Sequence, residues 1–219
     1  NWQAFLETCV SLKHLVIQDF IFNIELSNFA FKLSSLMILD FYIELQQRDW
    51  FYYEYEWQHK VLALIRAQKE SLKTLVMEVE RIYDPEIYGF MFKEMKLAEL
   101  SVPLNILQIN MPVENTTLKK LKIGFVSYID TAEFCEVLKI LYALEELDVK
   151  FCDRPLWNEF FGFLNNHMPM LRKLTIRTSG DRFPNKDTSV VWLKALQIET
   201  LVVRRLPTDV NKRSKFLTC

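Results

Sequence analysis

One short pattern of apolar positions recurs along the whole chain. Each copy has a leucine, two residues, a second leucine, one residue, and then an aliphatic or aromatic residue; the last copy opens with isoleucine instead. The copies begin at Leu12, Leu36, Leu72, Leu97, Leu118, Leu144, Leu171 and Ile198. Their first positions are 24, 36, 25, 21, 26, 27 and 27 residues apart. A period in the twenties, with one supersecondary unit per period, is typical of a solenoid.

Inside each copy the apolar residues alternate with polar or variable ones, which predicts a strand with one buried face. A stretch with helical spacing comes before several copies, such as Phe134, Val137, Leu138 and Leu141 ahead of Leu144. We therefore expect an α/β solenoid of about eight units, with parallel strands on the concave face and helices on the convex face. It should span residues 1–206, followed by a basic C-terminal tail at 207–219.

Two intervals depart from the common length. The 36-residue interval contains a run of aromatic residues, 50–57, which on a helix would place Trp50, Tyr53 and Trp57 on one face. We expect that face to pack, and Tyr52 and Tyr55 to be available for docking a partner. The 21-residue interval contains two prolines and predicts an irregular connection.

The copies resemble leucine-rich repeats, and in particular the longer, cysteine-containing type of F-box proteins. Cys9-Val-Ser-Leu12 matches the start of that repeat, and Leu144 through Cys152 matches the later part. The resemblance implies a leucine-rich repeat horseshoe. It also implies the substrate-recognition part of a ubiquitin ligase receptor, in which an F-box docks on a Skp-type adaptor. No F-box is recognisable here, so adaptor binding is expected only if one precedes Asn1. Residues 2–10 are expected to form the helix of a first repeat.

Composition limits the classes of protein to which the chain can belong. The chain has 219 residues, half of them hydrophobic, but no apolar run long enough for a membrane span. Its four cysteines show no close spacing, which favours an intracellular compartment, cytoplasmic or nuclear. The net charge of −1 is the sum of an acidic first half and a basic second half. Residues 1–116 carry 10 basic and 16 acidic side chains, whereas residues 117–219 carry 17 and 12. The two halves are thus expected to present different surfaces to partners.

Nothing in the sequence indicates catalysis. The three histidines, His14, His59 and His167, are far apart, and four glycines leave little for a phosphate-binding loop. The cysteines lack metal-ligand spacing. Asn115-Thr116-Thr117 matches the glycosylation acceptor pattern, which is short enough to arise by chance. We expect no enzyme activity, no cofactor and no metal.

The expected working surface is formed by the third, fifth and seventh positions of the copies, which should face the concave side. The first three copies place apolar residues there: Val16, Ile38, Tyr42 and Val76. The last four place basic residues there, interrupted by Glu146 and Asp148: Lys120, Lys122, Lys150, Lys173, Arg177 and Arg204. An acidic or phosphorylated segment of a protein would suit the basic end. The alternative is that these charges only keep the sheet soluble.

Two functions follow as hypotheses. The first is a non-catalytic protein-recognition module, the substrate-binding repeat domain of an F-box-type receptor. The second is a leucine-rich scaffold subunit of a stable complex, nuclear or RNA-related, whose basic half would contact RNA or an acidic partner. Binding to nucleic acid is the less favoured of the two contacts, and no contact with a membrane is expected.

Overall fold

The chain divides into two compact units, Asn1–Pro103 and Leu104–Cys219. The computed structural model describes residues 8–9, 11–18, 33, 35–43, 59, 61–79, 85–103, 114–126, 131–151, 156–179 and 198–206. Each unit combines parallel strands with helices. The fold class is therefore α/β.

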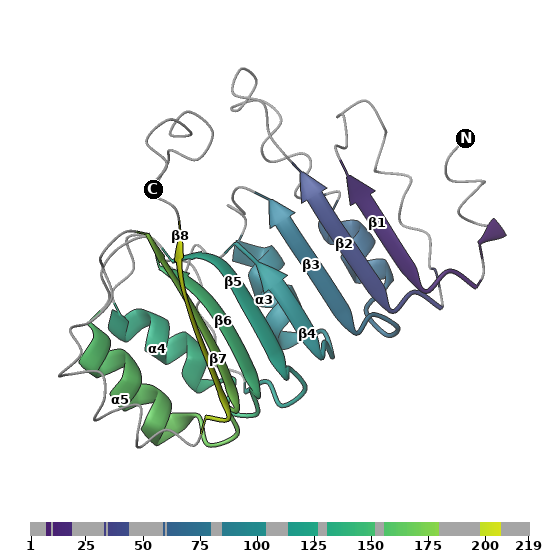
Figure 1. Cartoon of the computed structure of the whole chain (residues 1–219). Coiled ribbons are helices and arrows are strands. Elements are labelled where there is room, and N and C mark those ends of the chain that lie inside the picture. The colour runs from purple at the N-terminus through teal and green to yellow at the C-terminus, as the bar shows by residue number, and fades with distance from the viewer. Residues whose placement is uncertain are drawn as a thin grey trace. The chain divides into compact units, whose positions relative to one another are not determined.

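The first unit contains four described strands that pair in sequence order. They are β1 (His14–Gln18), β2 (Ile38–Ile43), β3 (Thr74–Val79) and β4 (Glu99–Val102), and every pairing is parallel (Figure 1). A helical segment at 61–67 precedes β3, and α3 (Pro85–Lys93) precedes β4. The second leucines of the four copies occupy one register: Leu15, Leu39, Leu75 and Leu100.

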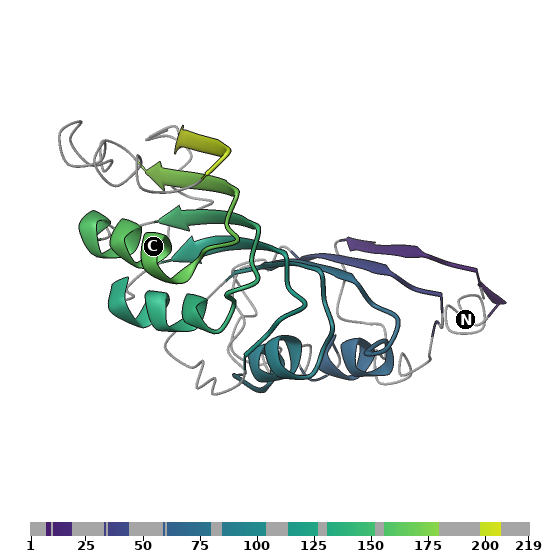
Figure 2. The ribbon, with the colours of Figure 1, turned by 90° about the horizontal axis from the view of Figure 1, so that it is seen from below.

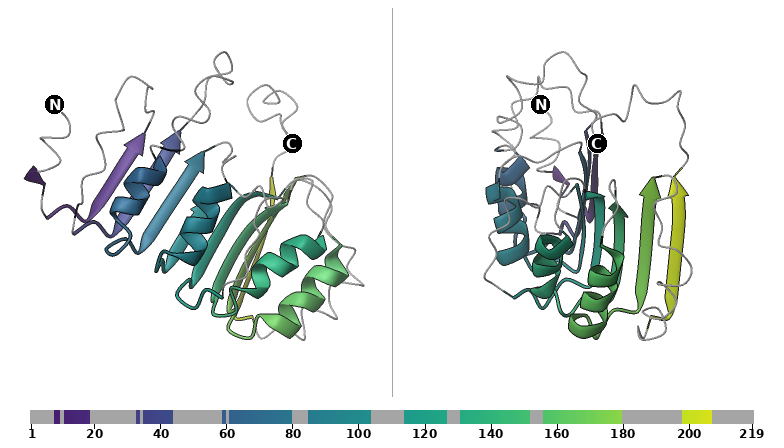
Figure 3. Two further views of the ribbon diagram at one scale, coloured as in Figure 1. Left: turned by 180° about the vertical axis from the view of Figure 1, so that it is seen from behind. Right: turned by 90° about the vertical axis from the view of Figure 1, so that its left-hand side faces the viewer.

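The second unit repeats this plan with longer strands and two fully described helices. The elements are β5 (Lys120–Val126), α4 (Thr131–Lys139), β6 (Glu146–Phe151), α5 (Trp157–His167), β7 (Lys173–Ser179) and β8 (Thr200–Leu206). All described pairings are parallel, and Leu121, Leu147, Leu174 and Leu201 share one register. Within each unit the described helices lie on one face of the strands (Figures 2 and 3).

The periodic leucine pattern predicted these strands correctly. Every copy yields a strand, and each strand begins two residues after the copy's first leucine or isoleucine. The helix expected ahead of Leu144 is α4. The next helix, α5, ends two residues before Pro169, a residue that lacks the N–H needed to continue a helix. None of the described helices is long and apolar enough to cross a membrane.

A repeated backbone junction joins neighbouring copies within each unit. The carbonyl of Lys13 accepts hydrogen bonds from the N–H groups of Met37 (2.9 Å) and Ile38 (3.0 Å) in the next copy. The same two-donor arrangement recurs at the carbonyls of Met37, Lys73, Lys119, Glu145 and Arg172. Because each junction fixes where the next strand starts, the copies stay in register.

The leucines of the pattern form the core, and their burial falls toward the first and last copies. Leu147 and Leu174 are at most 1% exposed, whereas Leu201 is 38% exposed and Leu15 is half-buried. An internal strand has a copy on both sides, so its inward side chains are covered twice. The first and last strands of a repeat array lack one of these neighbours.

Aromatic side chains fill the space between helices and strands in the second unit. Phe160 of α5 lies 6.0 Å from Phe134 of α4 and 5.3 Å from Phe151 of β6, measured between ring centroids. Trp157 contacts Phe151 edge-on at 5.6 Å and stacks on Phe161 at 5.7 Å. These contacts fix α4 and α5 against the sheet, since large aromatic rings bury the most apolar area per residue.

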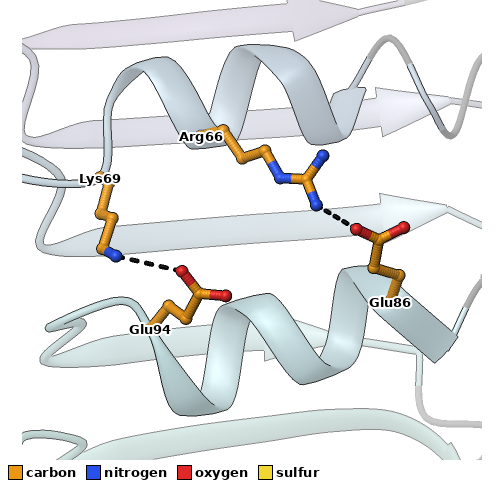
Figure 4. A network of polar contacts seen from close by, with 4 residues as sticks. All are labelled: Arg66, Lys69, Glu86 and Glu94. Carbon is orange, nitrogen blue, oxygen red and sulfur yellow. Dashed lines mark hydrogen bonds and ion pairs between the residues drawn. The ribbon is translucent and has the colours of Figure 1, made fainter.

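In the first unit, two ion pairs connect the helical segment 61–67 and the turn after it to α3 (Figure 4). Arg66 pairs with Glu86 at one end, and Lys69 Nζ lies 3.1 Å from Glu94 Oε2 at the other. Both cations also lie over the ring of Phe90, at 5.5 and 5.9 Å from its centroid. These contacts join the helical segment and α3 side by side (Figure 4).

Several predictions fall outside the described residues. They include the packing of Trp50, Tyr53 and Trp57, the irregular connection at 104–113 and the basic tail at 207–219. These stay predictions, as does the single repeat domain at 1–206.

Candidate functional site: the open face of the strands

The face of each unit opposite the described helices is called here the open face. It consists of the third, fifth and seventh positions of the copies. In β6 the alternation is complete, because Leu147, Val149 and Phe151 are buried while Glu146, Asp148 and Lys150 are partly exposed. The strand pattern therefore assigned the two faces correctly. Two open-face residues with small side chains, Ser101 and Thr175, are nonetheless buried.

In the first unit, the apolar side chains of the open face surround a charged one. The register places Asp40 between Val16 and Val76, and Ile38 and Tyr42 lie two residues before and after Asp40 on β2. Val16 is 45% exposed, and the other three apolar residues are half-buried. The register thus places these four apolar residues around Asp40.

Asp40 itself is held by a histidine of the neighbouring strand. His14 Nε2 lies 2.9 Å from Asp40 Oδ2, and the Asp40 side chain is only 14% exposed. The second carboxylate oxygen, Oδ1, is buried without a hydrogen-bond partner. The pair lies on open-face positions of β1 and β2 and joins these two neighbouring strands.

In the second unit, the open-face residues nearest the strand starts alternate in charge. Lys120, Glu146 and Lys173 occupy one register on β5, β6 and β7. Glu146 lies 3.1 Å from Lys120 Nζ and 2.9 Å from Lys173 Nζ. Hydrogen bonds from Lys173 and then Lys120 hold the pKa of Glu146 below its ordinary value. Two of the six basic residues proposed for the binding face are thus paired with an acid inside the sheet.

The next row contains a diagonal ion pair. Asp148 is opposite Lys122 on β5 and Thr175 on β7. Its Oδ1 accepts a hydrogen bond of 2.8 Å from Nε of Arg177, which lies two residues beyond Thr175. The contact therefore runs diagonally between β6 and β7. Nη2 of Arg177 is buried and has no hydrogen-bond partner.

The third row is cationic throughout. Lys150, Arg177 and Arg204 are direct register partners on β6, β7 and β8. On the β5 side, the seventh position of the copy is Gly124, and the β5–β6 register shifts between Ile123 and Val126. Such a bulge bends a strand locally, and bulges are frequent beside binding sites. This row of cations, defined here as the basic row, contains no carboxylate among its described members.

The other histidines and cysteines that the structure describes lie in different parts of the fold. His59 lies in the helical segment that precedes β3, and His167 at the end of α5 stacks on Phe163 with ring centroids 4.9 Å apart. Cys9 is half-buried and Cys135 is buried. Within the described ranges, no three histidine, cysteine or acidic side chains converge as a metal site would require.

Asn115 has a structural role in the turn before β5 that the sequence pattern did not predict. It is buried, and its Oδ1 accepts hydrogen bonds from the N–H groups of Thr117 and Leu118, both at 3.0 Å. Its own N–H donates to the carbonyl of Ile140 at 2.9 Å. The side chain therefore organises the turn into β5. The glycosylation pattern drew attention to this residue for a different reason, and a buried amide is a poor acceptor for a glycan.

Tyr52 and Tyr55, proposed as a docking surface, lie outside the described residues. Comparison with known proteins found no match to this chain among family models, curated proteins or solved structures.

Proposed function

We propose that this protein is a non-catalytic recognition module that binds a protein partner through the open face. The supporting observation is the in-register display of partly exposed side chains on neighbouring strands, apolar in the first unit and mainly cationic in the second. Neighbouring parallel strands are ~4.8 Å apart, so such rows present a dense and regular set of contacts. Binding surfaces of this kind are common in repeat proteins.

We further propose that the two units belong to one leucine-rich repeat horseshoe of about eight repeats. The regular period, the strand register and the repeated backbone junction all support a stacked array. In a horseshoe the open face would be concave and would partly enclose its partner. This architecture supports binding over an extended segment rather than at one small pocket.

From the resemblance to F-box-type repeats we propose a cellular role for the protein, as the substrate-binding part of a ubiquitin ligase receptor. In that role the partner is the substrate, and a Skp-type adaptor would bind an F-box elsewhere in the full-length protein. Co-purification of the full-length protein with such an adaptor tests this role. Failure to retain an adaptor would remove the ligase role and leave the recognition module intact.

The recognition function is tested by affinity capture from an extract of the native cells. Charge reversal at two open-face residues, Lys173→Glu with Arg177→Glu, is compared with the single reversal Lys139→Glu on α4. Lys139 is 52% exposed and pairs with Glu136 on its own helix. Proteins retained by the wild type and by the Lys139 variant but lost from the double variant support an open-face site. Equal capture by all three proteins contradicts it.

The second candidate, a scaffold subunit that contacts RNA, is favoured by one observation. The described open face of the second unit has six cationic side chains and two carboxylates, an excess of four positive charges. Binding of RNA driven by these charges would fall steeply with salt. Reversal of Lys120, Lys122 and Lys173 should then abolish the salt-dependent binding. Salt-insensitive capture of a protein favours the first function.

A further inference from the structure

We propose that two molecules of this protein associate head to tail, with the outer edge of β8 in one molecule bound to the outer edge of β1 in the other. The proposal goes beyond the recognition function, because it concerns an edge strand of each unit. Among the described strands, β1 pairs only with β2, and β8 pairs only with β7. An edge strand presents unpaired N–H and C=O groups to a further strand that fits beside it.

The register of the described strands defines which residues meet at this contact. Each pairing within a unit is parallel and, from the strand start, joins equivalent positions of neighbouring copies of the pattern. The same register between β8 of one molecule and β1 of the next brings together three pairs of aliphatic residues: Leu201 with Leu15, Val202 with Val16, and Val203 with Ile17. The two edges therefore match in the pairing geometry that the described strands already use.

Several of these aliphatic side chains are exposed in the single molecule. Val16 is 45% exposed on β1, and Leu201 and Val203 are 38% and 41% exposed on β8. Leu174 and Ile176, the equivalents of Leu201 and Val203 on β7, are 0% exposed, and β7 has a paired strand on both sides. Pairing of β8 with β1 of a second molecule removes apolar surface from water at both edges, which favours association.

The charges at the strand starts are complementary in the same register. Lys13 and Glu199 occupy the second position of their copies and become neighbours in the contact. Lys13 is exposed, and no ion pair joins it to another described residue. Glu199 already pairs with Arg172 at 3.3 Å, on its β7 side. Glu146 shows that one carboxylate in this fold can bind a cation from each neighbouring strand, so Glu199 can accept Lys13 as its second partner.

The backbone junction between copies is half-formed at each of the two edges. Inside the second unit, the carbonyl of Arg172 accepts hydrogen bonds from the N–H groups of Glu199 at 2.8 Å and Thr200 at 3.0 Å. Among the described residues, the carbonyl of Glu199 accepts no junction bond, and the N–H groups of Lys13 and His14 donate none. Pairing of the two edges supplies the missing half to each and repeats the junction between molecules.

The first copy also enters its strand as an inner copy does. The N–H of Leu12 donates to the carbonyl of Cys9 at 2.9 Å, and the N–H of Leu144 donates to the carbonyl of Leu141 at 2.9 Å. The β1 edge is thus preformed, which lowers the cost of association. Because the contact joins two different edges, each pair of molecules keeps one free β1 and one free β8. Association then continues into an open array or closes into a ring.

Sedimentation velocity of the full chain over a wide range of concentration tests the proposal. Val16→Lys disables the β1 edge and Val203→Lys disables the β8 edge, each at an exposed valine. Met170→Lys is the matched control, because Met170 is 45% exposed and lies in the turn before the internal strand β7. We expect wild type and the Met170 variant to form dimers and larger assemblies. Each edge variant alone should stay monomeric, whereas an equimolar mixture of the two should form a one-to-one dimer.

Charge exchange provides a second test that leaves the apolar surface intact. Lys13→Glu and Glu199→Lys should each weaken self-association by at least about threefold, through loss of an exposed ion pair. The variant with both substitutions should recover the wild-type affinity, because the two charges at every contact are then exchanged.

Two sets of results separate head-to-tail pairing from other contacts. A wild-type protein that is still monomeric at about 1 mM overturns the proposal. Self-association of either edge variant alone, as strong as that of wild type, also overturns it, because two like edges would then be in contact. Absence of a dimer in the mixture, together with no recovery in the charge-exchanged variant, overturns it as well.

Discussion

Nε of Arg177 donates a hydrogen bond of 2.8 Å to Oδ1 of Asp148, although the register places Thr175 opposite that aspartate. The two side chains are 19% and 33% exposed. A second ion pair in the same unit, Arg172 with Glu199, is 3.3 Å long, and its side chains are 61% and 66% exposed. The two pairs thus differ in solvent access while sharing the same chemistry.

This difference predicts unequal coupling energies. We expect about 1–2 kcal/mol between Asp148 and Arg177, because a partly buried charged hydrogen bond is poorly screened. For Arg172 and Glu199 we expect less than about 0.5 kcal/mol. Double-mutant cycles to alanine, followed by urea unfolding, measure both. Equal coupling of the two pairs would show that burial does not govern the strength of the Asp148–Arg177 contact.

The position of Glu146 between two lysines predicts a pH-dependent contribution to stability. The pKa of Glu146 is held below its ordinary value of 4.5, so its folded form favours the charged state. Its contribution is therefore fully present above pH 4.5 and is lost as the pH falls through the lower, folded pKa. Wild type should exceed Glu146→Gln in free energy of unfolding by less than about 1 kcal/mol at pH 7.

Urea unfolding at pH 7 and at pH 3.5 measures that difference, which should shrink at the lower pH. Glu145→Gln is the matched control, because Glu145 has one lysine partner, Lys119 at 3.1 Å, where Glu146 has two. A pH-independent difference for Glu146→Gln would refute the assigned role of its two lysine partners.

Equivalent leucines of internal and terminal copies should differ in their effect on stability. Leu147 on β6 is 1% exposed and Leu201 on β8 is 38% exposed, although both are the second leucine of their copy. Replacing Leu147 by alanine should cost about 2–5 kcal/mol through lost burial and a cavity. Leu201→Ala should cost less than about 1 kcal/mol, because much of that side chain already contacts water.

Thermal or urea unfolding of the two variants provides the comparison. A loss for Leu201→Ala as large as that for Leu147→Ala would mean that β8 is covered on its helix side in solution.

Asn115 is expected to be a stabilising cap. Asn115→Ala leaves the N–H groups of Thr117 and Leu118 without their acceptor and should cost about 1–3 kcal/mol in free energy of unfolding. The neighbouring Thr116 is exposed, and Thr116→Ala should be nearly neutral. Unfolding measurements on both variants test the assignment. Equal stability of the Asn115 variant and wild type would rule out the capping role.

The strands could be predicted from the sequence because every copy repeats the same leucine pattern. Leu121, Leu147 and Leu174 repeat one environment, and each copy independently specifies the same register. The faces followed from alternation alone. The turn residues were harder to predict, since Asn115 acts through two backbone N–H groups that no periodicity marks.

The ion pairs of the open face could not be predicted from the sequence. The sequence showed six basic residues and two acidic ones, but it did not show that Glu146 lies within reach of both Lys120 and Lys173. It also gave no sign that Arg177 bends back to Asp148 across Thr175. Side-chain reach across strands depends on the size of the intervening residue, and that is a property of packing.

The two-donor junctions between copies use only main-chain atoms. A carbonyl such as that of Lys73 accepts from the same two N–H groups whatever side chain it carries, and the six junction residues are chemically diverse: Lys13, Met37, Lys73, Lys119, Glu145 and Arg172. Gain or loss of one entire copy would therefore leave a two-donor junction between the copies that become neighbours. Loss of a single residue inside a copy would not. On this basis, we expect the fold to tolerate a change in the number of copies better than a change in the length of any one strand.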